Sequence, residues 1–235
     1  MSYPTAESAA DERVRRGMEA QLALRATALE NGDEPLGWKV GYGTPSAFER
    51  FGTVAPMTGF LLRSGLLDEG PPVSICGWSN PALEAEVAVR MASDLPPGAE
   101  PHTVRESIGA LAPAFELVDL NPGLEEVEGV LEANIFQRAV ILGAGSGGVA
   151  PEDLSATLQR AGEDAAEVED PQAATGEIVS IVRHVADLLG VFGERLAAGQ
   201  VIITGAITPP PIPVSAGERF DYELRPIGRM SVEFE

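Results

Sequence analysis

Glycine and proline interrupt this chain so often that most of its secondary structure must be short. Its 235 residues include 26 glycines and 19 prolines, about one residue in five against roughly one in eight in average proteins. Both residue types disfavour helix interiors and are frequent in turns. The density therefore favours a turn-rich fold with many short strands over a helical bundle. Two longer amphipathic stretches, 6–30 and 178–198, predict helices.

Strand-like segments dominate the chain from residue 71 onward. Apolar and β-branched residues gather there in short runs separated by proline or glycine, a pattern typical of strands. The runs are 73–77, 83–91, 111–120, 139–142, 201–205, 219–224 and 229–234, with a hairpin over 154–168. Earlier in the chain, 36–42 is strand-like and 45–51 could form a short helix, as could 124–133 later. Strands and helices do not alternate strictly, which argues against a doubly wound parallel sheet. We expect a helical region over 1–70 packed on a β-rich body over 71–235, together one structural unit.

Charge and cysteine content exclude several classes of partner. The formal net charge is −20, which argues against binding to nucleic acid or to an anionic membrane surface. Cys76 is the single cysteine, so an intramolecular disulfide is excluded and a reducing compartment fits. No apolar run approaches the roughly 18 residues of a membrane span, and the first residues lack a signal-peptide pattern. We expect a cytoplasmic protein that binds neither membrane nor nucleic acid.

The segment 83–91 carries two carboxylates at strand spacing. In a strand, Glu84 and Glu86 share one face, while Leu83, Ala85 and Val87 face the core. The two carboxylates then lie roughly 6–7 Å apart along the strand, and a hard cation between them would relieve their repulsion. Oxygen ligands favour Mg²⁺, Mn²⁺ or Ca²⁺ over Zn²⁺. A solvated outer face of the strand is the alternative interpretation.

Two further charged residues stand in apolar surroundings. Glu116 is flanked by apolar residues, so it either faces water at an edge or completes a three-carboxylate site with Glu84 and Glu86. Lys39, within GWKVG, is the only lysine among 16 basic residues. A lysine beside glycines and the apolar Trp38 can act as acid or base when it is desolvated. It could instead be an exposed lysine that blocks an edge strand. In a chain that otherwise uses arginine, this alternative loses weight.

Five motifs in sequence order resemble one enzyme group. The motifs are GWKVG at 37–41, PALEAEVAVRM at 81–91, APAFELVD at 112–119, AGQVIITGAITPP at 198–210 and IGRMSVEF at 227–234. This pattern is similar to the 2-keto-4-pentenoate hydratase / 2-oxo-acid decarboxylase group of the fumarylacetoacetate hydrolase superfamily. The resemblance runs from about residue 10 to the C-terminus.

The resemblance implies an α+β fold with a mixed β-roll or barrel-like body and an N-terminal helical part. It implies Mg²⁺ or Mn²⁺ held by Glu84, Glu86 and Glu116. It also implies that Lys39 is the catalytic acid/base in hydration or decarboxylation of a small unsaturated 2-oxo or 2-hydroxy acid, through a metal-stabilised enolate. Assembly into a homo-oligomer is a further expectation, since members of this group are commonly oligomeric. We expect four residues to contact the substrate: Trp38, Met57, Asn134 and Thr204.

Two positions depart from the pattern of the group. Met57 stands where an acid is expected in a P-D-x-G turn, and Ala133 stands where an A-D-N motif has its aspartate. A thioether cannot replace the acid as a proton partner of Lys39. One alternative is therefore a repurposed enzyme that catalyses cyclisation, isomerisation or C–C bond chemistry on a bulkier biosynthetic intermediate, with or without a metal. A second alternative is a non-catalytic subunit.

Overall fold

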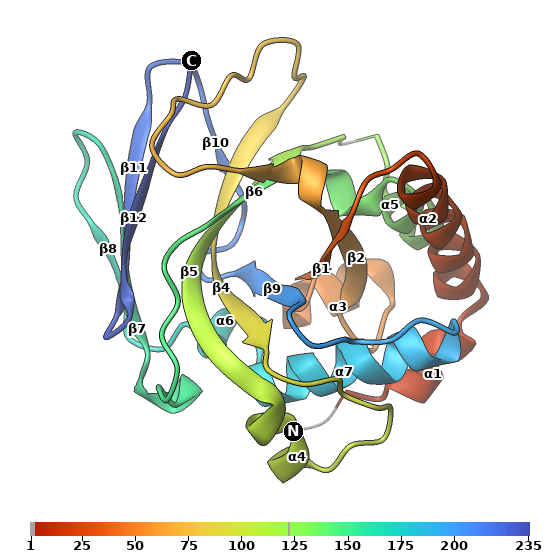
Figure 1. Cartoon of the computed structure of the whole chain (residues 1–235). Helices are drawn as coiled ribbons and strands as arrows, with labels where there is room; N and C mark the ends of the chain where they lie inside the picture. The colour runs from red at the N-terminus through yellow and green to blue at the C-terminus, as the bar shows by residue number, and fades with distance from the viewer. Residues whose placement is uncertain (1–2, 122) are drawn as a thin grey trace.

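A curved sheet of eight strands forms the centre of the computed structural model, which describes residues 3–121 and 123–235 (Figure 1). Along the sheet the order is β2-β1-β9-β4-β5-β6-β3, and β10 pairs with β4. The strands are β1 (Pro35–Gly41), β2 (Met57–Leu62), β3 (Leu66–Leu67), β4 (Pro81–Met91), β5 (Ile108–Asp119), β6 (Gln137–Leu142), β9 (Val201–Ala206) and β10 (Ile212–Pro213). Two pairs, β1 with β9 and β3 with β6, are parallel, and the other pairs are antiparallel. The expected mixed, barrel-like body is confirmed.

A second sheet of four strands packs on the convex side of β4 and β5, on the left in Figure 1. Its order is β12-β11-β7-β8, from β7 (Ser155–Arg160), β8 (Ala166–Val168), β11 (Arg219–Arg225) and β12 (Gly228–Glu233). The Tyr222 ring on β11 packs at a tilt of 51° against Phe115 of β5, with 5.7 Å between ring centroids, and its hydroxyl donates to the Glu86 backbone carbonyl. Burial of these aromatic rings fixes the second sheet against the strands that carry the acidic motif.

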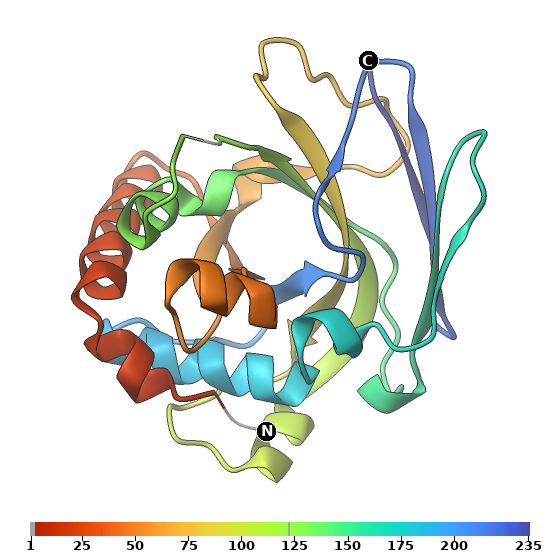
Figure 2. The ribbon, with the colours of Figure 1, turned by 180° about the vertical axis from the view of Figure 1, so that it is seen from behind.

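Helices cover the remaining sides of the curved sheet. They are α1 (Thr5–Ala10), α2 (Glu12–Glu30), α3 (Pro45–Phe51), α4 (Pro101–Ser107), α5 (Val127–Glu132), α6 (Gln172–Thr175) and α7 (Ile178–Val191). From behind, α2 and α5 lie side by side at one flank and α7 runs beneath the ring of strands (Figure 2). Gly17 permits the close approach of α2 to α5, because a Cβ there would lie 2.7 Å from Leu131 Cβ. No helix in the described parts of the chain is both long and apolar enough to cross a membrane.

The two faces of β4 show the predicted alternation, but both faces are buried. Leu83, Ala85 and Val87 belong to the large core between the sheets. Ala88 belongs to a smaller apolar cluster on the inner face, and Glu86 on that face is also fully buried. Curvature explains the difference, since the inner face of a closed-up sheet is shielded by the strands opposite it. The solvated outer face is therefore not the environment of Glu86.

Other element boundaries differ from those expected. The first helix is broken at Asp11, whose carboxylate accepts from the Arg13 backbone N–H and caps α2. The last helix ends at Val191, shortly before Gly193 with its positive φ of 75°. The segment 73–77 makes only an isolated bridge from Val73 to Phe234 rather than a strand. The region before residue 70 also supplies β1, β2 and β3 to the main sheet, so it is not purely helical.

Candidate active site

Three glutamates meet on the inner face of β4 and β5. Glu84 lies directly opposite Glu116 in the antiparallel register, and Glu86 follows two residues later on the same face. One carboxylate oxygen from each residue lies within 4.8 Å of the others. Glu86 and Glu116 are buried, whereas Glu84 is half-buried. The cross-strand pairing of β4 with β5 thus brings together residues that are 32 positions apart in the chain.

Lys39 reaches this cluster from β1, two strands away. Its Nζ donates to Glu116 Oε1 and to the Ile135 backbone carbonyl, the latter at 3.1 Å. The side chains of Lys39 and Glu116 are each 1% exposed. Gly59 on β2 lies beside Lys39, and a Cβ there would come within 2.9 Å of Lys39 Cγ. The alternative of an exposed lysine that blocks an edge strand therefore does not apply, because Lys39 is buried and paired with Glu116.

Negative charge is concentrated in this part of the molecule. Burial, followed by repulsion from Glu116, raises the pKa of Glu84 to about 7. Burial, followed by the charges of Glu116 and Glu84, raises the pKa of Glu86 well above its usual value. The ammonium of Lys39 lowers the pKa of both groups but does not offset these effects. One positive charge against three carboxylates leaves the cluster with a deficit of positive charge.

The donor set fits a divalent cation. Glu86 Oε2 accepts from the Gly205 backbone N–H at 2.6 Å, whereas Glu86 Oε1 is buried without a hydrogen-bond partner among the described residues. An unpaired buried carboxylate oxygen is costly unless a cation or donor meets it. The ligand atoms are all oxygens, which suits Mg²⁺, Mn²⁺ or Ca²⁺. Glu84, Glu86 and Glu116 are thus the residues that could hold such an ion.

A cavity of about 510 Å³ adjoins the cluster, a size typical of sites for small ligands. Lys39, Glu84 and Thr204 line it, together with residues of the segment after β1, of α3 and of the loop after β9. The other lining residues with side-chain polar groups are Tyr42, Thr44, Ser46, Arg50 and Thr175. Burial and the charge of Glu84 raise the pKa of Tyr42 to about 12. The Tyr42 hydroxyl therefore remains a hydrogen-bond donor at neutral pH.

Of the four expected substrate contacts, only Thr204 is among the described residues that line the cavity. Thr204 lines the cavity, and its hydroxyl donates to the Val87 carbonyl at 3.0 Å. Trp38 is on the opposite face of β1 from Lys39, where its ring lies 4.8 Å below the Arg25 guanidinium. Met57 is packed in a separate apolar cluster with Phe51. Trp38 and Met57 are therefore absent from the cavity lining, and so is Ala133.

Asn134 has a supporting position instead of a place in the cavity lining. It begins a turn of three consecutive residues with positive φ, Asn134 (49°), Ile135 (51°) and Phe136 (62°). Such left-handed conformations are unfavourable for residues other than glycine. The Asn134 side chain holds the turn by accepting from the Phe60 N–H at 2.8 Å and donating to the Phe60 carbonyl at 3.0 Å. The turn presents the Ile135 carbonyl to Lys39.

Sequence reasoning missed Tyr42, Arg50 and the Ile135 carbonyl as parts of the site. Two glycines flank Tyr42 in the sequence GYG, and this was the available signal that the backbone turns sharply there. Tyr42 indeed has a positive φ of 55°. Nothing in the local sequence indicates that Ile135 adopts a left-handed conformation, since β-branched residues strongly avoid it.

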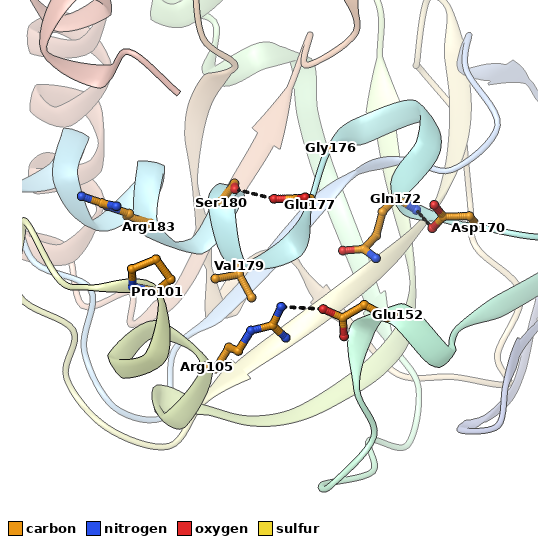
Figure 3. Close-up of a pocket in the computed structure, with 10 residues that line it drawn as sticks. All are labelled: Pro101, Arg105, Glu152, Asp170, Gln172, Gly176, Glu177, Val179, Ser180 and Arg183. Carbon is orange, nitrogen blue, oxygen red and sulfur yellow. Dashed lines mark hydrogen bonds and ion pairs between the residues drawn. The ribbon is translucent and has the colours of Figure 1, made fainter. Parts of the chain in front are cut away.

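A second cavity, of about 670 Å³, lies beside the start of α7 and is larger than the first (Figure 3). Its charged groups pair with one another or with near neighbours: Arg105 binds Glu152 at 2.5 Å, and Arg183 lies 3.6 Å from Asp187. The sticks in Figure 3 show side chains from α4, α6 and α7 around it. None of the three clustered glutamates lines it. The cavity beside Lys39 is the candidate active site.

The fold is similar to that of fumarylacetoacetate hydrolase family proteins. No family model matches the chain. Its curated relatives are hydratases and decarboxylases of one group; 2-hydroxyhexa-2,4-dienoate hydratase of Comamonas testosteroni is 28% identical over 211 residues, 87% of this chain and 80% of the relative. The resemblance to the 2-keto-4-pentenoate hydratase / 2-oxo-acid decarboxylase group is thereby confirmed, and the chain is an enzyme of lyase type.

Solved structures agree with this assignment. The 4-oxalocrotonate decarboxylase of Pseudomonas putida G7, complexed with calcium and acetate, superposes with a TM-score of 0.85 at 26% identity over 93% of this chain and 85% of that one. The same decarboxylase complexed with magnesium and adipate gives a TM-score of 0.87 at 24% identity, over 100% of this chain and 90% of that one. Divalent metal binding is thus a property of the related structures.

Proposed function

We propose that this chain is a lyase that depends on Mg²⁺ or Mn²⁺ and acts on a small unsaturated 2-oxo or 2-hydroxy acid. The observation that carries the proposal is the convergence of Glu84, Glu86 and Glu116 within 4.8 Å, beside a buried lysine and a cavity. The calcium and magnesium complexes of the related decarboxylase support it. A cation in this set would supply Lewis-acid stabilisation of negative charge that develops on the 2-oxo oxygen.

Lys39 is the proposed acid/base. An ammonium has three N–H donors, and Glu116 and the Ile135 carbonyl take up two of them. The third is available to a substrate in the cavity that Lys39 lines. Since the side chain is 1% exposed, bulk water competes little with the substrate for this proton. Glu116 and Ile135 thus orient Lys39 for proton transfer to or from a substrate carbon.

The site favours decarboxylation or ketonisation over hydration. Addition of water requires a group that activates the water, and the thioether of Met57, which stands where the enzyme group has an acid, neither lines the cavity nor can do so. Among the described residues that line the cavity, Glu84 alone is acidic. It belongs to the proposed cation set and is therefore not free to activate water. Loss of CO₂ leaves the electron pair of the broken C–C bond delocalised onto the 2-oxo oxygen, where a cation held by the three glutamates would stabilise it, and the carbon then regains a proton. Lys39 can deliver that proton.

Turnover of two substrates tests this proposal. The protein with Mg²⁺ is incubated with 2-hydroxypenta-2,4-dienoate and, separately, with an unsaturated 2-oxo dicarboxylate, while ultraviolet absorbance and released CO₂ are recorded. We expect CO₂ release from the dicarboxylate that stops with a chelator and in Lys39→Ala, but persists in the control Arg229→Gln on the far sheet. Failure to convert either acid with any divalent metal would contradict the proposal.

The structure gives no specific support to the repurposed enzyme or the non-catalytic subunit. The first rested on Met57 and Ala133, but both lie outside the described lining, so neither adds apolar surface to the cavity. The second expects loss of functional side chains, whereas Lys39 and the three glutamates are all present and in contact range.

A further inference from the structure

The proposed cation ligand Glu86 is held in place by a glycine in an irregular part of β9. The register between β4 and β9 shifts by one residue between the pairs Glu86–Ala206 and Ala88–Ile203, so β9 contains a β-bulge. Gly205 lies in this bulge with a positive φ of 95°, and its backbone N–H donates to Glu86 Oε2 at 2.6 Å. This bond leaves Glu86 Oε1 as the oxygen that remains for a cation.

Gly205 is supported from outside its own strand. Glycine has more backbone freedom than any other residue, and a bulge disrupts the ladder that fixes a regular strand. The support comes from Thr175, the last residue of α6, because a Cβ added at Gly205 would lie 3.3 Å from Thr175 Cγ2. Thr175 is 5% exposed and lines the candidate active-site cavity. Its methyl group therefore packs against the backbone that holds Glu86.

Tyr3 fixes Thr175 in turn. The Tyr3 hydroxyl donates to the Thr175 backbone carbonyl at 3.1 Å. Gly176 permits this approach, because a Cβ there would lie 2.2 Å from the Tyr3 hydroxyl oxygen, and Figure 3 shows Gly176 in the turn between α6 and α7. The Tyr3 ring is itself anchored, since it meets the His184 ring of α7 edge to face with 5.4 Å between centroids.

We propose that Tyr3 is a positioning residue of the active site, which acts on Glu86 from outside the cavity. Tyr3 restrains Thr175, and Thr175 restrains the Gly205 bulge. The bulge then fixes the direction of the Glu86 carboxylate. Tyr3 is not among the described residues that line the cavity, so its effect passes through these contacts. This inference rests on the proposed cation site and adds to it a residue far from the glutamates in the chain.

A fixed carboxylate should bind a small divalent cation more tightly than a mobile one. Mg²⁺ demands near-ideal octahedral geometry, and groups that orient its ligands typically contribute about ten- to a hundred-fold to metal affinity. The Gly205 N–H is such a group for Glu86. Tyr3 acts two contacts further out, so its loss should have a smaller effect, near the value of one hydrogen bond.

Hydrogen exchange in the metal-free chain tests the link without any cation. The exchange rate of the Gly205 amide is measured by NMR in the wild type, in Tyr3→Phe and in Ser107→Ala. The last variant is a matched control, because it removes a buried hydroxyl bond to the Val104 carbonyl in α4. We expect the Gly205 amide to exchange at least about three-fold faster in Tyr3→Phe than in the control. The Ile202 amide, also in β9, corrects for any general loss of stability.

Mn²⁺ affinity tests the consequence for the site. Tyr3→Phe should bind Mn²⁺ at least about three-fold more weakly than Ser107→Ala. Thr175→Ser removes the methyl group on Gly205 and should also weaken Mn²⁺, whereas Thr175→Val keeps that methyl group and should bind Mn²⁺ more tightly than Thr175→Ser. Tyr3→Phe should add little in the Thr175→Ser background, because both changes act on the same contact.

The outcomes separate this inference from the proposed function. Exchange of the Gly205 amide or an Mn²⁺ affinity that is equal in Tyr3→Phe and Ser107→Ala would overturn the positioning role. Weaker Mn²⁺ binding in Thr175→Val than in Thr175→Ser would do the same. Faster Gly205 exchange in Tyr3→Phe, in a chain that binds no Mn²⁺, would support the link from Tyr3 to the bulge while contradicting the proposed cation site.

Discussion

The ammonium of Lys39 and the carboxylate of Glu116 form one buried ion pair, with both side chains 1% exposed. The proposed acid/base is thus bonded directly to one member of the proposed cation site. Any change at Lys39 also changes the charge around Glu116, so stability and activity must be measured together at this position.

Lys39→Met should both inactivate and destabilise the protein. Removing one partner of a buried pair leaves an unpaired charge, which costs about 3–5 kcal/mol, and loss of a general acid reduces turnover by about 10²–10⁴. Denaturant unfolding and turnover with Mg²⁺ measure the two effects. The double variant Lys39→Met/Glu116→Gln should recover stability without activity. A stable, fully active Lys39→Met would contradict the assignment.

Glu84 should make the metal-free protein less stable as the pH rises. Its pKa is about 7 in the folded chain, above the usual value near 4.3, so the folded state binds the proton more tightly. The stabilisation is complete below the unfolded pKa and is lost as the pH rises through about 7. Relative to the wild type, Glu84→Gln should therefore become more stable between pH 5 and pH 8. Equal pH dependence of unfolding in the two proteins would refute this.

His184 should have the opposite pH dependence. Burial lowers its pKa from 6.5 to about 4, so the neutral ring stabilises the fold above pH 6.5 and the contribution is lost as the pH falls toward 4. Its ring links Thr5 of α1 at 2.8 Å with the Pro56 carbonyl at 3.0 Å. His184→Gln should lower stability at pH 7 and reduce the acid-induced loss between pH 6.5 and 4. His102, which is exposed, provides the control His102→Gln.

Asn134 should support Lys39 through the left-handed turn. Asn134→Ala removes two hydrogen bonds to Phe60, each worth about 1 kcal/mol, and releases three residues from an unfavourable conformation. We expect a loss of about 2–3 kcal/mol of stability and a fall in kcat larger than the rise in KM, because the Ile135 carbonyl no longer orients Lys39. Asn80→Ala, which removes one exposed bond to Leu120, is the matched control. A kcat equal to that of the control would contradict this role.

Local rules predicted the β4 pattern, whereas the set of three glutamates with Lys39 was implied by the resemblance to the hydratase/decarboxylase group. Alternation places Glu84 and Glu86 on one face, and Glu116 stands alone in an apolar run. Whether that face was solvated could not be read from β4 itself. It depends on the curvature of the sheet and on Lys39, which lies on β1, 45 positions before Glu84, and contacts Glu116.

The cavity wall could not be predicted, because it depends on unfavourable backbone conformations. Tyr42, Asn134, Ile135 and Phe136 all have positive φ, against their local preferences. Tertiary contacts impose these conformations, and they decide which side chains reach the cavity. Trp38 was expected beside the substrate for its apolar ring, but alternation along β1 places it behind the sheet, beneath Arg25.

Cation binding tests the central claim most directly. Metal-free protein is titrated with Mn²⁺ while free Mn²⁺ is followed by electron paramagnetic resonance, for the wild type, Glu86→Gln and the exposed control Glu163→Gln. The account predicts one Mn²⁺ per chain in the wild type and the control, and a large loss of affinity in Glu86→Gln, whose Oε1 is the unpartnered buried oxygen. Equal Mn²⁺ binding in Glu86→Gln, or no binding in the wild type, would contradict it.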